Sequence, residues 1–203
     1  AERIHILGYS AGTRVVMNAL YEMALIYQNN TEQEISEQIK LGNLILVGSD
    51  IDTGLFASYV LVGLLRVQDR LTLYASPADK ALKLSETIFN HRRVGEVLAG
   101  TLDNRMREFV ASSSRLAMVD VGNAANFDAG NGHAYFRKSP WVSSDILMTL
   151  RYGLAPGERG LTKSDESPIW RFPDDYAERF EAALQTVNPR FRNATSNTGV
   201  ALP

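Results

Sequence analysis

The sequence predicts an α/β fold, a doubly wound and mostly parallel sheet with helices on both faces. Short, continuously apolar segments alternate with longer segments whose apolar residues recur every three or four positions, as in helices. A strand that is apolar on both faces needs cover from both sides, which crossover helices provide. The 203 residues fit one domain, which we expect over residues 1–186, followed by a disordered polar tail at 187–203.

The first half of the chain predicts three strands, each followed by a helix. Residues 4–7 form an apolar run typical of a buried strand that stops at Gly8, and the apolar residues within 13–27 have helical spacing. The polar segment 30–38 is expected to be a linker. The next strands and helices have the same two patterns and are predicted at residues 44–47, 55–65, 70–74 and 80–89.

The second half predicts one more strand and two helices. A long polar segment after residue 89 has room for a further short helix, and residues 116–121 form the fourth apolar run. A loop rich in Gly, Asn and Ala follows at 122–132, and helices are predicted at 140–152 and 174–184.

Composition and charge exclude several functional classes. The net charge of −2 predicts no electrostatic binding of nucleic acid or of anionic membranes. The chain has no cysteine, so disulfides and thiolate metal sites are excluded. No apolar run approaches the length of a membrane-spanning helix, and neither the dinucleotide-binding glycine pattern nor a P-loop is present. We expect no metal and no organic cofactor.

Residues Gly8-Tyr9-Ser10-Ala11-Gly12 form the pattern G-x-S-x-G between the first predicted strand and the first predicted helix. In a nucleophile elbow, such small flanking residues allow a sharp turn that raises the serine hydroxyl above the sheet. The pattern alone is weak because Gly and Ser are common, and its place between a strand and an amphipathic helix makes it specific. The alternative interpretation is a structural turn with a serine cap. We predict that Ser10 is a nucleophile.

A serine nucleophile needs a general base, and the chain has three histidines. His5 lies inside the first predicted strand, and His91 lies in a basic polar segment. His133 follows the fourth strand, just beyond the glycine-rich loop. Loops after parallel strands meet at the carboxyl edge of the sheet, so we predict His133 as the base.

Several aspartates follow predicted strands and could orient the imidazole. Asp79 follows the third strand, Asp50 and Asp52 follow the second, and Asp120 and Asp128 lie at and after the end of the fourth. Asp79 also precedes a predicted helix, so helix capping is a rival role. Its position favours Asp79 as the acid, with Asp50 and Asp52 as the alternatives.

Five segments together resemble the bacterial α/β-hydrolase family of unknown function called DUF900. They are GYSAG at 8–12, DID at 50–52, YASPADKAL at 74–82, RRVGE at 92–96 and GHAYF at 132–136. The resemblance covers residues 3–150 and implies a sheet of the α/β-hydrolase type. It also implies an esterase-like or lipase-like activity and a triad of Ser10, Asp79 and His133 in that chain order.

In α/β hydrolases about four strands precede the elbow strand, whereas only three residues precede the first predicted strand here. We therefore expect a chain that holds only the later strands, from the elbow strand onward, and whose first strand is covered by a missing N-terminal segment or by a second copy in a homo-oligomer. The upstream half also supplies one oxyanion donor in this fold. The donor identifiable in this chain is the N–H of Ala11.

The sequence thus predicts a serine hydrolase that acts on a small-molecule acyl ester. The alternatives are an acyltransferase with the same triad and a catalytically inactive binding or scaffold protein on the same fold. We expect the pocket and lid to come from residues 56–65, 90–115 and 124–130. The sequence does not define the substrate.

Overall fold

The computed structural model describes residues 2–83, 94, 104–124 and 133–188, and within them five strands form one sheet. The strands lie side by side in chain order, and every neighbouring pair is parallel. They are β1 (Ile4–Tyr9), β2 (Leu41–Val47), β3 (Arg70–Ala75), β4 (Leu116–Asp120) and β5 (Trp170–Arg171). The four predicted strands are confirmed, and β5 is a further strand of two residues that has no apolar run in the sequence.

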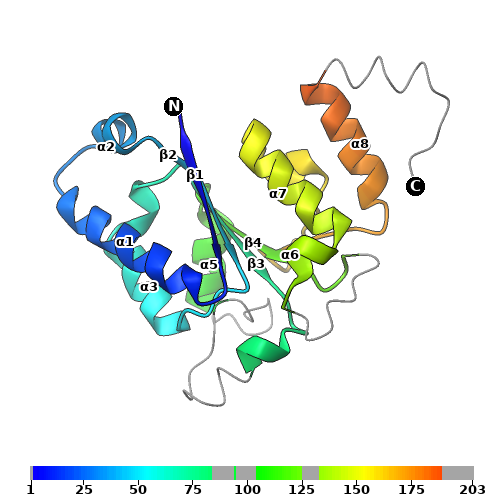
Figure 1. Ribbon diagram of the computed structural model, residues 1–203, viewed down its shortest axis with the longest axis horizontal. Helices are drawn as coiled ribbons and strands as arrows, with labels where there is room; N and C mark the ends of the chain where they lie inside the picture. Colours follow the sequence, from blue (N-terminus) through cyan, green and yellow to red (C-terminus); the bar gives the residue numbers. More distant parts are fainter. Residues whose placement is uncertain (1, 84–93, 95–103, 125–132, 189–203) are drawn as a thin grey trace.

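Helices cover both faces of this sheet, as predicted. One face carries α1 (Gly12–Ile26), α2 (Glu32–Ile39), α3 (Thr53–Leu61) and α5 (Asn104–Ser112). The other carries α6 (Tyr135–Lys138), α7 (Pro140–Tyr152) and α8 (Tyr176–Val187), as Figure 1 shows with the sheet nearly edge-on. Two 3₁₀ turns complete the described elements, η1 (Leu64–Arg66) and η4 (Gly157–Arg159). The predicted doubly wound α/β architecture is therefore confirmed.

Each strand supplies side chains to two separate apolar cores. In β2, Leu44 and Leu46 pack with α1, α3 and α5, whereas Ile45 and Val47 pack with α6, α7 and α8. All four are 0% exposed. Successive side chains of a strand point to opposite faces, so a strand with both faces covered reads as one continuous apolar run.

The first predicted strand is present as β1, which lies at an edge of the sheet formed by the described residues. Among the described residues β1 pairs with β2 alone. Ile4 is 53% exposed and Leu7 is 38% exposed. The apolar run marks β1 correctly as a strand, but the number of its neighbours depends on tertiary structure.

The predicted linker at 30–38 is also wrong, because it contains the helix α2. Thr31 accepts a hydrogen bond from the Glu34 N–H, and the Glu34 carboxylate accepts one from the Thr31 N–H, so the two residues form a capping box. Ile35 is buried in the first core. The pattern Thr-x-x-Glu is a sequence signal for the start of a helix, but the polar composition of the segment favoured a linker.

The remaining predicted helices agree with the structure as far as it describes them. The helix at 140–152 has the predicted bounds, and α8 begins two residues later than predicted and ends at Val187. The helix predicted at 80–89 begins at Lys80, and its residues from 84 onward lie outside the described part. The predicted tail lies outside it from residue 189.

The C-terminal elements are joined to the sheet by a buried polar cluster around Asp145 of α7. Its carboxylate pairs with Arg159 of η4 at 2.7 Å and accepts a hydrogen bond from the Tyr74 hydroxyl of β3 at 2.5 Å. The Tyr176 hydroxyl of α8 lies 3.4 Å away. Asp145 and Arg159 are 0% exposed. Loss of one partner would leave a buried charge uncompensated, which is strongly destabilising.

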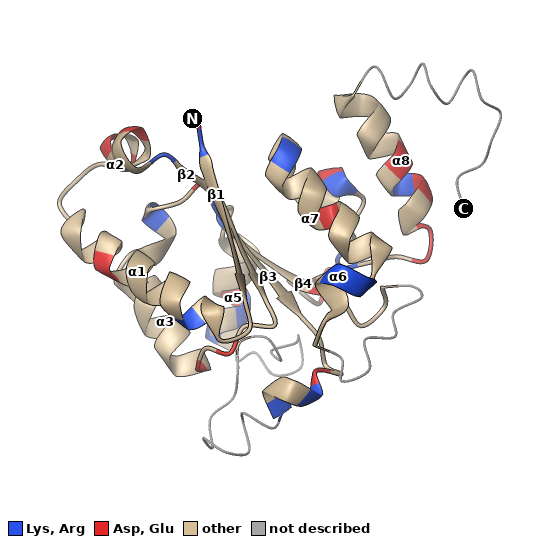
Figure 2. Cartoon of the chain, in the orientation of Figure 1, with Lys and Arg blue, Asp and Glu red and all other residues tan. Residues whose placement is uncertain are grey.

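Figure 2 shows charged residues of both signs spread over many of the described elements. Within that same part of the chain, no helix is long and apolar enough to cross a membrane.

Candidate active site

Ser10 occupies a strained turn between β1 and α1. Its φ is +52°, in the left-handed region, and among the described non-glycine residues only Lys40 shares a positive φ. The Ser10 N–H donates to the Val47 carbonyl at 3.0 Å, and the Thr13 hydroxyl donates to the Ser10 carbonyl at 2.6 Å. These bonds hold a conformation that an L-residue rarely adopts, as at a nucleophile elbow.

The two glycines of the G-x-S-x-G pattern differ in what they do. A Cβ on Gly8 would lie 3.0 Å from the Leu46 side chain and 3.4 Å from the Thr13 Cα, so Gly8 allows close packing of strand and helix. A Cβ on Gly12 would meet nothing within 4 Å. The space around the first glycine of the pattern is therefore tight, whereas the space around the second is open.

The N-terminus of α1 lies directly after Ser10. Ala11 occupies the N-cap position, and no side chain caps this helix, so the interpretation of Ser10 as a capping residue is wrong. Backbone N–H groups at a helix N-terminus carry partial positive charge, which favours an anion beside them.

His133 and Asp79 form a buried pair at the carboxyl edge of the sheet. The His133 Nδ1 lies 2.6 Å from the Asp79 Oδ2. Asp79 is 0% exposed and His133 is 8% exposed. The two residues are 54 positions apart in the chain, and the parallel strands β3 and β4 deliver them to the same edge.

Asp79 also caps the helical residues that follow it, and both roles coexist. Its Oδ1 accepts hydrogen bonds from the N–H groups of Ala81 and Leu82, each at 3.1 Å, while its Oδ2 faces the imidazole. The capping bonds fix the orientation of the carboxylate and leave one oxygen directed at His133. Capping and orientation were rival predictions, yet a carboxylate has oxygens enough for both.

The alternative acids have other partners in the structure. The Asp50 carboxylate accepts a hydrogen bond from Arg14 at 2.6 Å, and Asp52 caps α3 by accepting from the Leu55 N–H at 2.9 Å. Asp120 lies 3.5 Å from the Arg171 guanidinium. Asp128 lies outside the described residues.

The other histidines do not join this group. The His5 Nδ1 accepts a hydrogen bond from the Asn43 N–H at 2.8 Å, near the start of β2 and away from its carboxyl end. His91 lies outside the described residues.

Ser10 is linked to the His133–Asp79 pair through its neighbours. The ring of Tyr9 lies 4.9 Å from the His133 ring, centroid to centroid. The Ser10 N–H donates to the carbonyl of Val47, the last residue of β2. The next residue is Gly48, whose φ is +52°. A Cβ on Gly48 would lie 2.9 Å from the His133 Cε1, so the Gly48 backbone passes close to the imidazole and leaves no room for a side chain between them.

Sequence reasoning missed Tyr9, Gly48 and Tyr135 as parts of this site. The Tyr135 hydroxyl is buried and accepts a hydrogen bond from the Gly48 N–H at 2.7 Å. Burial raises the pKa of Tyr135, so its hydroxyl stays neutral. A glycine that ends a strand hints at a positive φ, but no sequence signal pairs it with a tyrosine 87 residues away.

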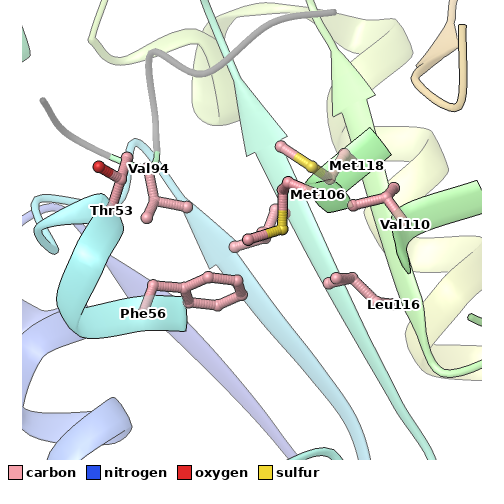
Figure 3. Close-up of a pocket in the computed structure, with 8 residues that line it drawn as sticks. Thr53, Phe56, Val94, Met106, Val110, Leu116 and Met118 are labelled. Carbon is pink, nitrogen blue, oxygen red and sulfur yellow. The ribbon is translucent and has the colours of Figure 1, made fainter. Parts of the chain in front are cut away.

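An apolar cavity of about 40 Å³ lies over β3 and β4 between α3 and α5 (Figure 3). Phe56, Val94, Met106 and Val110 line it and fall within the segments predicted to form a pocket. Most of its lining belongs to the first core, and the lining does not include Ser10, Asp79 or His133. We therefore interpret this cavity as incomplete core packing.

A parallel sheet whose strand turns through a strained serine into a helix is the arrangement of the α/β hydrolases, and this chain is a protein of that class. A family model described as "Alpha/beta hydrolase of unknown function (DUF900)" matches residues 1–151. The chain belongs to this family, which confirms the resemblance found in the sequence. No curated protein and no solved structure matches the chain. The family makes a hydrolase activity plausible and leaves the reaction undefined.

Proposed function

We propose that this chain is a serine hydrolase that cleaves acyl esters, with Ser10 as nucleophile, His133 as general base and Asp79 as the group that orients the imidazole. In the first half of the reaction the Ser10 Oγ attacks the ester carbonyl carbon while the His133 Nε2 takes the hydroxyl proton. The carbonyl oxygen becomes an oxyanion, which the Ala11 N–H at the start of α1 stabilises. The imidazolium then protonates the leaving alcohol, and an acyl-serine remains.

In the second half a water molecule replaces the alcohol. His133 removes a proton from this water as its oxygen attacks the acyl carbon, and then returns the proton to the Ser10 oxygen as the carboxylic acid leaves. Enzyme atoms and charges are restored at the end of the cycle. Asp79 keeps its charge throughout and stabilises the imidazolium that forms twice.

The single observation that carries the proposal is the 2.6 Å contact between the His133 Nδ1 and the Asp79 carboxylate. A carboxylate on Nδ1 directs the proton-accepting Nε2 of the neutral ring away from Asp79. The strained Ser10 turn supports the same proposal, because strain at a serine that ends a strand is typical of an exposed nucleophile.

A fluorophosphonate probe tests the proposal in one covalent step. We expect mass spectrometry of the labelled, digested protein to find the phosphonyl adduct on Ser10, and Ser10→Ala to abolish the labelling. Ser112→Ala, at an exposed serine of α5, is the matched control and is expected to label like the parent chain. A folded parent chain that labels no more than Ser10→Ala would contradict the proposed nucleophile.

A further inference from the structure

We propose that Tyr135 is a positioning residue for the His133 imidazole, because its buried hydroxyl holds the Gly48 backbone against the ring. The inference rests on the proposed function, in which His133 is the general base. It adds a residue whose effect on the imidazole is transmitted through Gly48.

The Tyr135 hydroxyl joins the carboxyl ends of two strands. It accepts a hydrogen bond from the Gly48 N–H and donates one to the Tyr74 carbonyl, both at 2.7 Å. The direct contact between that N–H and that carbonyl is longer, at 3.3 Å. Val47 and Tyr74 are the last paired residues of β2 and β3, so the hydroxyl enters where the two strands begin to separate. The position of Gly48 relative to β3 therefore depends on this hydroxyl.

Gly48 in turn limits the space available to the acid–base pair. A Cβ at Gly48 would lie 2.9 Å from the His133 Cε1, 3.2 Å from its Nδ1 and 3.4 Å from the Asp79 Oδ2. The backbone thus lies against both members of the pair. Tyr135 follows His133 by two residues, so one short segment carries both the imidazole and the hydroxyl that binds the Gly48 backbone beside it.

Loss of the hydroxyl has a definite structural consequence. Without it, the Gly48 N–H keeps only its long 3.3 Å hydrogen bond to the Tyr74 carbonyl, and we expect this bond to shorten because buried backbone groups need good partners. That movement draws Gly48 toward β3 and changes its contact with the ring. General-base catalysis depends on the position of the base, so the turnover step is affected more than ester binding.

The test compares Tyr135→Phe with Tyr176→Phe. Both tyrosines are almost completely buried and both lose one hydroxyl, but the Tyr176 hydroxyl donates to Asp145 on α7, whereas the Tyr135 hydroxyl binds Gly48 beside the His133 ring. Hydrolysis of p-nitrophenyl acetate gives kcat and KM, the fluorophosphonate gives the labelling rate of Ser10, and proton NMR gives the resonance of the His133 Nδ1–H. This resonance is assigned by its loss in Asp79→Asn.

For Tyr135→Phe we expect kcat and the labelling rate to fall roughly tenfold or more, with KM within about twofold of the parent value. We also expect the Nδ1–H resonance to shift, because its hydrogen bond to Asp79 changes length. For Tyr176→Phe we expect a lower Tm with the resonance and kcat unchanged. If Tyr135→Phe does not fold, 3-fluorotyrosine at position 135 keeps the shape, weakens the hydroxyl as an acceptor, and is expected to shift the same resonance.

The inference is overturned if Tyr135→Phe lowers Tm as Tyr176→Phe does and leaves both the resonance and kcat at parent values. Failure of the proposed function looks different. In that case the parent chain does not label at Ser10, and the NMR comparison alone decides whether Tyr135 positions the ring.

Discussion

The substitution Gly48→Ala is expected to lower activity far more than it lowers stability. Gly48 has a φ of +52°, and an added Cβ would lie 2.9 Å from the His133 Cε1. Ordinary contacts of this kind begin near 3.4 Å, so the ring or the backbone must move by about half an ångström or more. If the backbone at position 48 stays where it is, the imidazole must leave its present position.

The magnitude has two parts. An L-residue in the left-handed region costs about 1–2 kcal/mol in the free energy of unfolding, or about 2–4 °C in Tm per kcal/mol for a chain of this size. Displacement of a catalytic group by 1 Å can cost about a hundredfold, so we expect the Ser10 labelling rate and kcat to fall by about tenfold to a hundredfold. The backbone conformation and the clash both lower stability, and the displacement of the imidazole lowers catalysis in addition.

Gly153→Ala separates these two parts. Gly153 ends α7 with a φ of +65°, and a Cβ there would meet nothing within 4 Å. It therefore has the backbone cost without the clash, and we expect a loss of Tm no larger than that of Gly48→Ala, with activity retained. Thermal unfolding and fluorophosphonate labelling of both variants provide the comparison. A folded Gly48→Ala chain that labels at the rate of Gly153→Ala would refute the placement of His133 against Gly48.

Two further predictions follow from the carboxylates and from the core. Asp79→Asn is expected to lower kcat by up to about 10⁴-fold, because an amide favours the wrong imidazole tautomer. The Asp50 carboxylate pairs with Arg14, so kcat of Asp50→Asn is expected to stay within a few-fold of the parent value. If steady-state assays show the larger loss for Asp50→Asn, the acid is Asp50. Val110→Ile adds one methylene beside the apolar cavity and is expected to raise Tm by about 2–3 °C, since a buried methylene contributes about 0.8 kcal/mol; a lower Tm in calorimetry would show that the space cannot accept it.

Much of the fold could be predicted because its signals are local. Continuous apolar runs marked four strands, and helical spacing marked α1, α3, α7 and α8, since side-chain periodicity depends only on the backbone geometry of each segment. The errors also have physical causes. The sequence of α2 is mostly polar, and the start of this helix is marked only by a capping box. The strand β5 has two residues, which are too few for a periodic pattern.

The candidate site was predictable in part for the same reason. The G-x-S-x-G pattern between a strand and a helix indicated Ser10, and chain order indicated His133. The sequence could not show that Asp79 divides its two oxygens between a helix cap and the imidazole, which removes the conflict between its two predicted roles. It also could not show that Gly48 lies beside the ring and binds the Tyr135 hydroxyl, because these contacts join segments far apart in the chain.

The sequence by itself determined the order of the first four strands and of most helices, the sharp serine turn and the set of residues able to act as acid or base. Tertiary structure alone decided which carboxylate meets His133, that β1 lies at an edge, and which backbone surface supports the imidazole. The physical reason is that periodicity and turn chemistry are properties of short segments. The meeting of side chains 54 and 87 residues apart depends on strand order, register and packing, which no short segment contains.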